Sequence, residues 1–372
     1  MKYYIIAGEA SGDLHASNLM KSIHKLDGSA SFRCWGGDLM KTQGGDMVKH
    51  YRDLAFMGFS EVAMNIRTII GNIKFCKEDI LQNKPDALIL VDYPGFNLRI
   101  AEFAHKSGLK VFYYISPQVW AWKKSRVFKI KKFVDRMFVI LPFEKDFYAR
   151  YDCDVDFVGH PLLDMIETLP PNIENAFRQK YGLSALPIIA LLPGSRKQEI
   201  SKMLPLMLSV IPKFPDYQFV MAGAPSIETV FYSHLIGKSN VKLISGATHA
   251  LLQNSFAALV TSGTATLETA LFNVPEVVCY KGSFISYQIA KRVIDPSIIK
   301  YISLVNLIMD KEVVKELIQN DLTPWNLILE LNKITADKAI REQMFKDYNQ
   351  LREKLGGSGA SEKTAKLILN YL

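Results

Sequence analysis

Short runs of consecutive apolar residues alternate with longer amphipathic stretches over the first part of the chain. The apolar runs lie at residues 3–7, 32–35, 87–91, 111–115 and 137–141. A short unbroken apolar run is typical of a strand buried on both faces, as in parallel sheets, and the amphipathic stretches are typical of crossover helices. The pattern therefore predicts a doubly wound α/β domain.

The same pattern restarts after a short linker, which is bracketed by the segments 158–161 and 169–172. The new apolar runs lie at residues 188–192, 218–222, 241–244, 257–260 and 276–280. Beyond Asn306 the pattern predicts helix only. We therefore expect two Rossmann-like domains that face a central cleft. Their predicted bounds are 1–165 and 172–345, with a C-terminal helix in 346–372 that packs on the first domain.

Composition excludes several classes of protein. Of the 372 residues, 49% are hydrophobic and 22% are charged, which is typical of globular proteins rather than disordered ones. No apolar run reaches the roughly 18 residues that span a bilayer, and the first residues resemble a strand rather than a signal peptide. We therefore expect a cytoplasmic protein. The four cysteines lie far apart, which argues against disulfides or a zinc site.

The loops after the predicted strands of the first half hold two groups of polar residues. In the first loop, Glu9, Ser11, Gly12 and Asp13 precede a helix, where free N–H groups can bind an anion. Ser11 or Asp13 could equally cap that helix. Asp92 follows the run at 87–91 and could accept a proton from a bound hydroxyl. The alternative for Asp92 is a turn residue that precedes a proline.

Two loops of the second half are suited to a nucleoside diphosphate. Gly194, Ser195 and Arg196 offer backbone N–H groups, a hydroxyl and a guanidinium to an anion. The segment 262–268 supplies small residues and a helix start beside Glu268, whose carboxylate could accept ribose hydroxyls. A surface arginine after a turn is the alternative for Arg196.

The net charge of +8 indicates an anionic partner, and much of the positive charge lies in one stretch. Cations alternate with aromatic residues from Trp120 to about residue 136. This composition fits a membrane surface, stacked single-stranded nucleic acid, or only a solvated helix. The residues that we expect to face a membrane are Trp120, Trp122, Lys123, Lys124, Arg126, Lys129 and Lys132.

Taken together, the motifs resemble the lipid-A-disaccharide synthase family, which are inverting glycosyltransferases of the GT-B fold. The matching segments occur in the family's order at residues 7–13, 57–62, 92–97, 114–122, 141–145, 157–161, 191–196, 262–268 and 303–307. The resemblance implies transfer of 2,3-diacylglucosamine from UDP to 2,3-diacylglucosamine 1-phosphate (lipid X). A β-1′,6 bond forms and UDP leaves.

The resemblance also implies roles for individual residues. Asp92 would be the general base, Glu9 a second carboxylate of the cleft, and Ser11–Asp13 an acceptor or phosphate loop. The nucleotide site would comprise Gly194, Ser195, Arg196, Ser262, Gly263, Thr264, Ala265, Glu268 and Asn306. The family often carries a second aspartate where this chain has Gly95, which argues against paired carboxylates here.

The resemblance implies no cofactor and no metal, because the UDP-sugar is a substrate. Its implied partners are UDP-diacylglucosamine, lipid X and the inner surface of the cytoplasmic membrane, with a homodimer possible and no nucleic acid. Two alternatives stay open. One is another UDP-sugar enzyme of the GT-B type, either a 2-epimerase or a muropeptide-type transferase. The other is a nucleic-acid-binding protein that uses residues 120–136.

Overall fold

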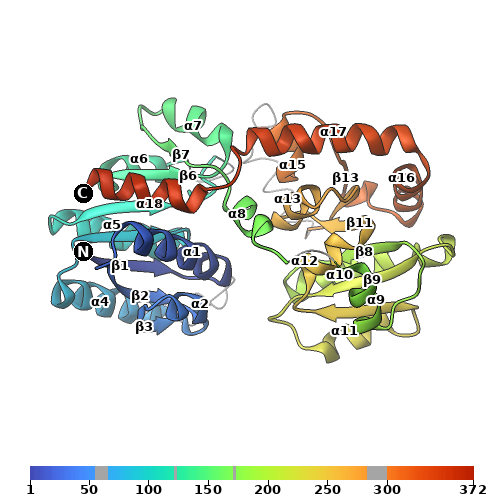
Figure 1. Ribbon diagram of the computed structural model, residues 1–372, viewed down its shortest axis with the longest axis horizontal. Helices are drawn as coiled ribbons and strands as arrows, with labels where there is room; N and C mark the ends of the chain where they lie inside the picture. The colour runs from blue at the N-terminus through green and yellow to red at the C-terminus, as the bar shows by residue number, and fades with distance from the viewer. Residues whose placement is uncertain (55–65, 121–123, 171–172, 283–299) are drawn as a thin grey trace. The chain divides into compact units, whose positions relative to one another are not determined.

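The computed structural model describes residues 1–54, 66–120, 124–170, 173–282 and 300–372 (Figure 1). The chain forms two compact units. Unit 1 comprises Met1–Thr168 together with Leu355–Leu372, and unit 2 comprises Leu169–Lys354. The second boundary lies later than residue 346, where the sequence placed it, because one uninterrupted helix, α17, runs from Lys338 to Lys354.

Unit 1 contains a seven-stranded sheet in the order β3-β2-β1-β4-β5-β6-β7, with every neighbouring pair parallel. The strands are β1 (Lys2–Ala7), β2 (Ser31–Gly36), β3 (Asp46–His50), β4 (Ala87–Val91), β5 (Lys110–Tyr114), β6 (Arg136–Val139) and β7 (Asp156–Phe157). The five apolar runs of the first half match β1, β2, β4, β5 and β6. The edge strands β3 and β7 were not predicted, because they carry polar residues and are only partly buried.

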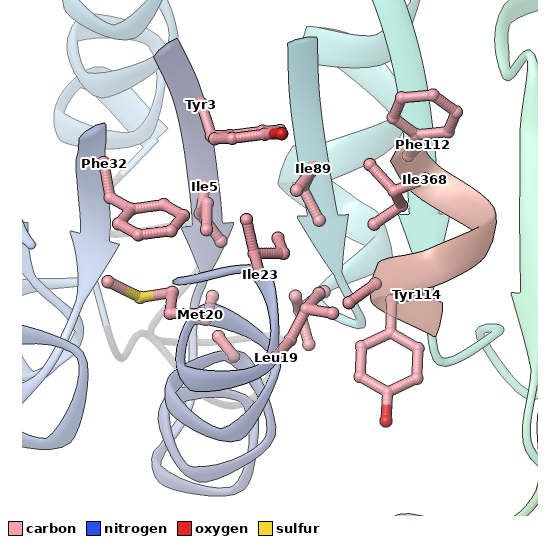
Figure 2. Packing of buried hydrophobic residues seen from close by; sticks show 14 of the residues in the cluster. Tyr3, Ile5, Leu19, Met20, Ile23, Phe32, Ile89, Phe112, Tyr114 and Ile368 are labelled. Atoms are coloured by element: carbon pink, nitrogen blue, oxygen red, sulfur yellow. The ribbon is translucent and has the colours of Figure 1, made fainter. Parts of the chain in front are cut away.

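Helices cover both faces of this sheet. They are α1 (Ala10–Leu26), α2 (Asp38–Thr42), α4 (Ile66–Asn83), α5 (Pro94–Lys106), α6 (Arg126–Phe133), α7 (Pro142–Ala149), α8 (Pro161–Glu167) and α18 (Ala360–Tyr371). The last helix, α18, packs beside α1 although almost the whole chain separates them (Figure 1). Its Ile368 is fully buried in a cluster with Leu19 of α1 and Tyr114 of β5 (Figure 2).

Asp164 of α8 caps the start of α18. Its carboxylate accepts hydrogen bonds from the backbone N–H groups of Gly359 (2.6 Å), Ala360 (3.1 Å) and Ser361 (3.0 Å). These N–H groups belong to the first turn of the helix and have no acceptor within it. The carboxylate therefore fixes the position where the chain re-enters unit 1.

We expect Asp164→Ala to lower the free energy of unfolding by about 1–2 kcal/mol, because a lost N-cap leaves helix donors unsatisfied. Chemical denaturation followed by circular dichroism measures the change. Asp146→Ala, at an exposed position of α7 in the same unit, is the matched control. Equal stabilities of the two variants would show that the cap contributes nothing.

Unit 2 contains a six-stranded parallel sheet in the order β10-β9-β8-β11-β12-β13. The strands are β8 (Ile188–Leu192), β9 (Gln218–Gly223), β10 (Val241–Ser245), β11 (Ser255–Thr261), β12 (Glu276–Tyr280) and β13 (Lys315–Ile318). The expectation of helix alone after Asn306 is wrong. Residues 315–318 form the edge strand β13, which is only four residues long and half polar, so its sequence carries little strand signal.

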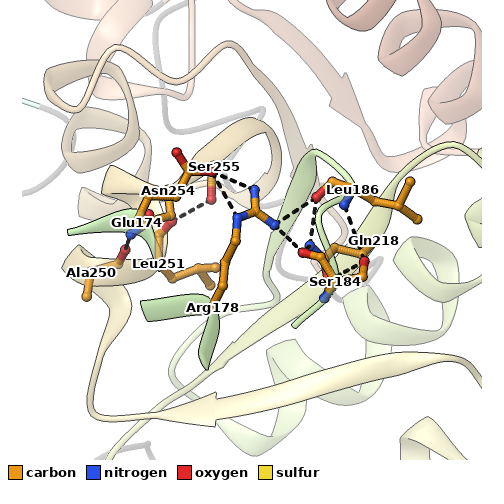
Figure 3. A network of polar contacts seen from close by, with 9 residues as sticks. All are labelled: Glu174, Arg178, Ser184, Leu186, Gln218, Ala250, Leu251, Asn254 and Ser255. Atoms are coloured by element: carbon orange, nitrogen blue, oxygen red, sulfur yellow. Dashed lines mark hydrogen bonds and ion pairs between the residues drawn. The ribbon is translucent and has the colours of Figure 1, made fainter. Parts of the chain in front are cut away.

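The helices of unit 2 pack around its sheet (Figure 1). They are α9 (Glu174–Tyr181), α10 (Lys197–Leu208), α11 (Thr229–Ile236), α12 (Thr248–Gln253), α13 (Thr264–Leu271), α15 (Leu304–Met309), α16 (Pro324–Ala336) and α17. Arg178 links α9 to the loop that enters β8. Its guanidinium donates to Glu174 at 2.9 Å and to the carbonyl of Leu186 at 3.0 Å, and the Gln218 side chain donates to the same carbonyl at 2.7 Å (Figure 3).

In the part of the chain that the structure describes, no helix is both long enough and apolar enough to cross a bilayer.

Candidate active site

Two carboxylates leave the same edge of the unit 1 sheet. Strands β1 and β4 are parallel neighbours, and Ala7 pairs with Val91, so Glu9 and Asp92 follow adjacent strand ends. Glu9 is exposed at the start of α1, whereas Asp92 is partly buried. Burial, and secondly the negative charge of Glu9, raise the pKa of Asp92 to about 6. Glu9 therefore affects Asp92 electrostatically although position 95 carries no carboxylate, and the expectation that Asp92 acts without a paired carboxylate stays a prediction.

The loop of Asp92 packs tightly against the loop of Glu9. The ring of Tyr93 lies on the backbone of Gly8, where a Cβ atom would come within 2.3 Å of the ring carbon Cγ. Only glycine fits at position 8. This close approach explains the glycine that the sequence pattern placed directly after β1.

The predicted acceptor or phosphate loop is largely structural. The buried carboxylate of Asp13 accepts hydrogen bonds from the backbone N–H groups of Gly37 (2.8 Å), Leu39 (3.1 Å) and Met40 (3.1 Å). Asp13 therefore caps α2 rather than facing a ligand, and it caps a different helix from the one that the sequence suggested. Gly12 is buried against Ala7, and only Ser11 is exposed.

Unit 2 has a cavity of about 320 Å³ at the carboxyl ends of β8, β9 and β11. Seven of the nine predicted nucleotide-site residues line it: Gly194, Ser195, Ser262, Gly263, Thr264, Ala265 and Glu268. Further residues that line the cavity were not predicted from the sequence. They are Glu199 in the first turn of α10, Gly223 at the end of β9, Ala224 and Pro225 directly after it, and Thr248 at the start of α12. Gly223, which ends β9, is the sequence feature that could have indicated these residues.

Two helix N-termini lie at this cavity. Helix α10 begins two residues after Ser195, and α13 begins at Thr264. The first-turn N–H groups of a helix attract negative charge. Gly194 adopts a φ of +111°, which a side chain would strain, and a Cβ atom there would lie 2.9 Å from Oε2 of Glu199. The glycine turn thus allows the backbone to line the cavity.

Arg196 and Asn306 are not among the residues that line the cavity. The Arg196 side chain is 67% exposed, and its Nη1 lies 3.4 Å from Oε1 of Glu199. Asn306 is fully buried: its Oδ1 accepts from the N–H groups of Val313 and Val314, and its Nδ2 donates to Glu316 at 2.9 Å. Asn306 therefore organises the approach to β13, and its contact with a nucleotide stays a prediction.

Glu268 contacts His249, which was not predicted from the sequence. Its Oε2 lies 3.5 Å from Nε2 of His249, on α12, and the His249 ring stacks on Phe272 with centroids 5.7 Å apart. Nothing in the spacing of these residues indicates the contact. It arises because α12 and α13 meet beside the cavity.

The basic aromatic stretch divides into buried and exposed residues. Trp120 is only 7% exposed and packs edge-on against Phe143, so its prediction as a membrane-facing residue is wrong. A buried ring is also not free to stack on a nucleic-acid base. Trp122 and Lys123 lie outside the described residues, as does the matching segment 57–62.

Helix α6 carries the exposed part of that stretch. Val127, Ile130 and Phe133 are buried at helical spacing, which turns the opposite side of the helix to solvent. Lys129, Lys131 and Lys132 of this helix are exposed, as is Lys124 just before it, while Arg126 is partly buried. Phe128, 61% exposed, lies among them and supplies the aromatic surface that was assigned to Trp120.

Among the described residues, no group of three or more His, Cys, Asp or Glu side chains is arranged to hold a metal ion.

Comparison with solved structures identifies the fold. S. aureus MnaA, solved with UDP, superposes with a TM-score of 0.71 at 16% identity and covers 100% of this chain and 96% of its own. The calicheamicin glycosyltransferase CalG4 gives 0.62 at 16% identity, with 100% and 98% covered. At such identities the likeness shows the fold alone. It confirms the predicted GT-B fold of two parallel-sheet α/β domains.

Comparison of sequences is more specific. The family model described as lipid-A-disaccharide synthetase matches residues 3–370. The lipid-A-disaccharide synthase of Syntrophus aciditrophicus is 40% identical, with 99% of this chain and 97% of that protein covered. Those of Geobacter sulfurreducens and Myxococcus xanthus are 37% and 36% identical, with 99% of this chain and 96% and 97% of theirs covered. The chain belongs to the lipid-A-disaccharide synthetase family.

Proposed function

We propose that this enzyme condenses UDP-2,3-diacylglucosamine with lipid X to give tetraacyl lipid A disaccharide 1-phosphate and UDP. The observation that carries the proposal is the family match over residues 3–370. The geometry of each unit supports a division of labour in which unit 2 binds the sugar nucleotide and unit 1 binds the lipid acceptor.

Unit 2 would bind UDP in the cavity at the ends of β8, β9 and β11. The N-termini of α10 and α13 and the hydroxyls of Ser195 and Thr264 are suited to the diphosphate. Glu268 would accept hydrogen bonds from the ribose hydroxyls. Arg196 would leave Glu199 and bind the diphosphate, which exchanges a weak exposed ion pair for charge-assisted hydrogen bonds to phosphate.

Unit 1 would supply the base. Asp92 takes the proton of the acceptor 6-hydroxyl while that oxygen attacks C1 of the donor sugar. The bond from C1 to the diphosphate oxygen breaks in the same displacement, UDP leaves, and the configuration at C1 inverts. A pKa of about 6 leaves Asp92 ionised at neutral pH while keeping it basic enough to accept a proton. Backbone N–H groups and Arg196 offset the charge that develops on UDP, so no metal or cofactor has a role in this scheme.

A direct assay tests the proposal. The protein is incubated with UDP-2,3-diacylglucosamine and lipid X, and products are identified by mass spectrometry. We expect a tetraacylated disaccharide phosphate and equimolar UDP. If the disaccharide is absent while UDP-N-acetylglucosamine is converted to its 2-epimer, the chain is a 2-epimerase and the proposal is wrong.

The acceptor is amphiphilic, so we also propose that α6 binds the cytoplasmic face of the inner membrane. Lys124, Lys129 and Lys132 would meet anionic headgroups, and Phe128 would enter the interface. Each lysine near an anionic surface contributes about 1 kcal/mol. A homodimer remains an expectation of the sequence alone.

Replacing these three lysines with alanine should weaken binding to phosphatidylglycerol vesicles by about 100-fold, which corresponds to about 3 kcal/mol. Co-sedimentation at low salt measures the partition. The control replaces Lys202, Lys213 and Lys238, three exposed lysines of unit 2, and changes the net charge equally. If both triple variants bind alike, α6 is only a solvated basic helix.

A further inference from the structure

The main chain at Asp92 has an unusual conformation. Asp92 and Tyr93 have φ angles of 44° and 50°, so two consecutive residues with side chains occupy the left-handed region. Residues other than glycine rarely adopt this conformation, and two in succession need support from their surroundings. The double turn sets the direction in which the Asp92 carboxylate leaves the end of β4.

Two buried side chains hold this turn through a single atom, the main-chain oxygen of Asp92. The hydroxyl of Tyr113 donates to it at 2.5 Å, and the side-chain amide of Asn97 donates to it at 2.7 Å. The Asn97 amide also lies 3.3 Å from the carbonyl of Val91, the last residue of β4. Both side chains are completely buried. Because they come from β5 and α5, the turn is supported by elements on two sides.

Tyr93 adds a third support. Its ring lies on Gly8, and its hydroxyl donates to the carbonyl of Leu54 at 3.3 Å. The turn is therefore tied to the loop that carries Glu9. A relaxed turn would change the position of the Asp92 carboxylate relative to that loop without unfolding the sheet.

We propose that Tyr113 and Asn97 are positioning residues for the Asp92 base, because their hydrogen bonds to its main-chain oxygen hold the left-handed turn that aims the carboxylate. This inference rests on the proposed function, in which Asp92 accepts the proton of the acceptor hydroxyl. Neither side chain has to touch a substrate. Their contribution should appear in turnover rather than in substrate binding.

The chain offers a matched pair of variants for the test. Tyr113 and Tyr114 are consecutive, completely buried residues of β5, and consecutive residues of a strand point to opposite faces of the sheet. The Tyr114 side chain belongs to the cluster with Ile368 of α18 (Figure 2). Only the main-chain oxygen of Tyr114 contacts Asp92, accepting from its N–H at 3.2 Å, and a change of the side chain to phenylalanine leaves that bond in place. Tyr113→Phe and Tyr114→Phe each remove one hydroxyl from the same strand, and only the first removes a bond to the turn.

We expect Tyr113→Phe to lower kcat by about 10-fold or more, since small displacements of a reacting group have effects of this size. The KM values of both substrates and the calorimetric affinity for UDP should stay within about twofold, and Tyr114→Phe should leave kcat within the same margin. If the two variants have the same kcat, or if Tyr113→Phe changes only KM, the positioning role is wrong.

A double variant separates this inference from the proposed function. If Tyr113 acts through Asp92, then Tyr113→Phe should cause no further loss in the Asp92→Asn background. A tenfold further loss there would overturn the positioning role, even with Asp92 as the base. Normal turnover of Asp92→Asn alone would instead overturn the assignment of the base. Thermal unfolding of each variant shows whether its fold is intact.

Discussion

Asp92→Asn should lower turnover by about 100-fold or more, because the loss of a general base removes this much rate. The affinity for UDP should be unchanged, because the proposed nucleotide site lies in unit 2. The temperature of thermal unfolding should rise, so the variant should be less active and more stable than the wild type. Burial and Glu9 make the Asp92 charge unfavourable in the folded state, raising its pKa from 3.8 to about 6. An inactive variant that is more stable than the wild type cannot be explained by misfolding.

The sign of the stability change follows from proton binding. A carboxyl whose pKa is higher in the folded state contributes stability below pH 3.8, and this contribution is lost as the pH rises to about 6. At neutral pH the wild type therefore bears a penalty of about 3 kcal/mol, which asparagine does not bear. Normal turnover, or an unfolding temperature below that of the wild type, would contradict this account of Asp92.

The same pKa predicts the pH dependence of the reaction. Only ionised Asp92 accepts a proton, so kcat/KM should rise with pH and level off above about 6. Glu9→Gln removes a negative charge that raises this pKa, and the rising limb should shift to lower pH. Glu167→Gln, an exposed change elsewhere in unit 1, is the control. An unshifted limb in Glu9→Gln would show that the two carboxylates do not interact.

Replacing Glu276 with methionine should stabilise the protein at pH 7 by about 1–3 kcal/mol, the cost of leaving a buried polar group without a hydrogen bond. Glu276 begins β12 and is completely buried, and neither of its carboxyl oxygens has a hydrogen-bond partner among the residues that the structure describes. Burial, and secondly the charge of Glu316, raise its pKa well above 4.5. The carboxyl must therefore take up a proton, or remain an unpaired buried charge, when the chain folds at neutral pH.

The dependence of this stability change on pH follows from the same proton linkage. Stability from the protonated Glu276 is present below pH 4.5 and is lost as the pH rises toward the folded-state pKa, at about 1.4 kcal/mol per unit. Methionine has a similar volume and no charge, so the variant should lose this pH dependence. Denaturation at pH 5 and pH 8 measures it, with Glu342→Met on the exposed side of α17 as the control. A less stable Glu276→Met protein at pH 8 would contradict the prediction.

Most of the central strands could be predicted from the sequence, and seven of the nine residues that it assigned to a nucleotide site line the unit 2 cavity. Buried parallel strands need unbroken apolar runs, and ligand-binding loops follow their carboxyl ends, so both leave a local signal. The loops after β8 and β11 were found in this way. The edge strands β3, β7 and β13 were not, because an edge strand is partly solvated and its polar residues resemble a loop.

The side-chain environments that matter most here depend on residues distant in the sequence. Asp13 caps α2, which begins 25 residues later, and Trp120 is buried against Phe143 of α7. His249 reaches Glu268 only because α12 and α13 meet. A hydrophobic period or a motif reports which residues could fulfil a role, and it carries no information about which partner occupies the space beside them.

The sequence by itself therefore determined the two α/β domains, their family, and which loops hold polar residues at the ends of strands. Only the tertiary structure decided which of those residues line the unit 2 cavity, which are structural caps, and how the neighbours of Asp92 change its pKa. The physical reason is the distance along the chain over which each effect acts. Apolar periodicity and turn chemistry act over a few residues, whereas burial and charge interactions act between atoms that only the folded chain brings together.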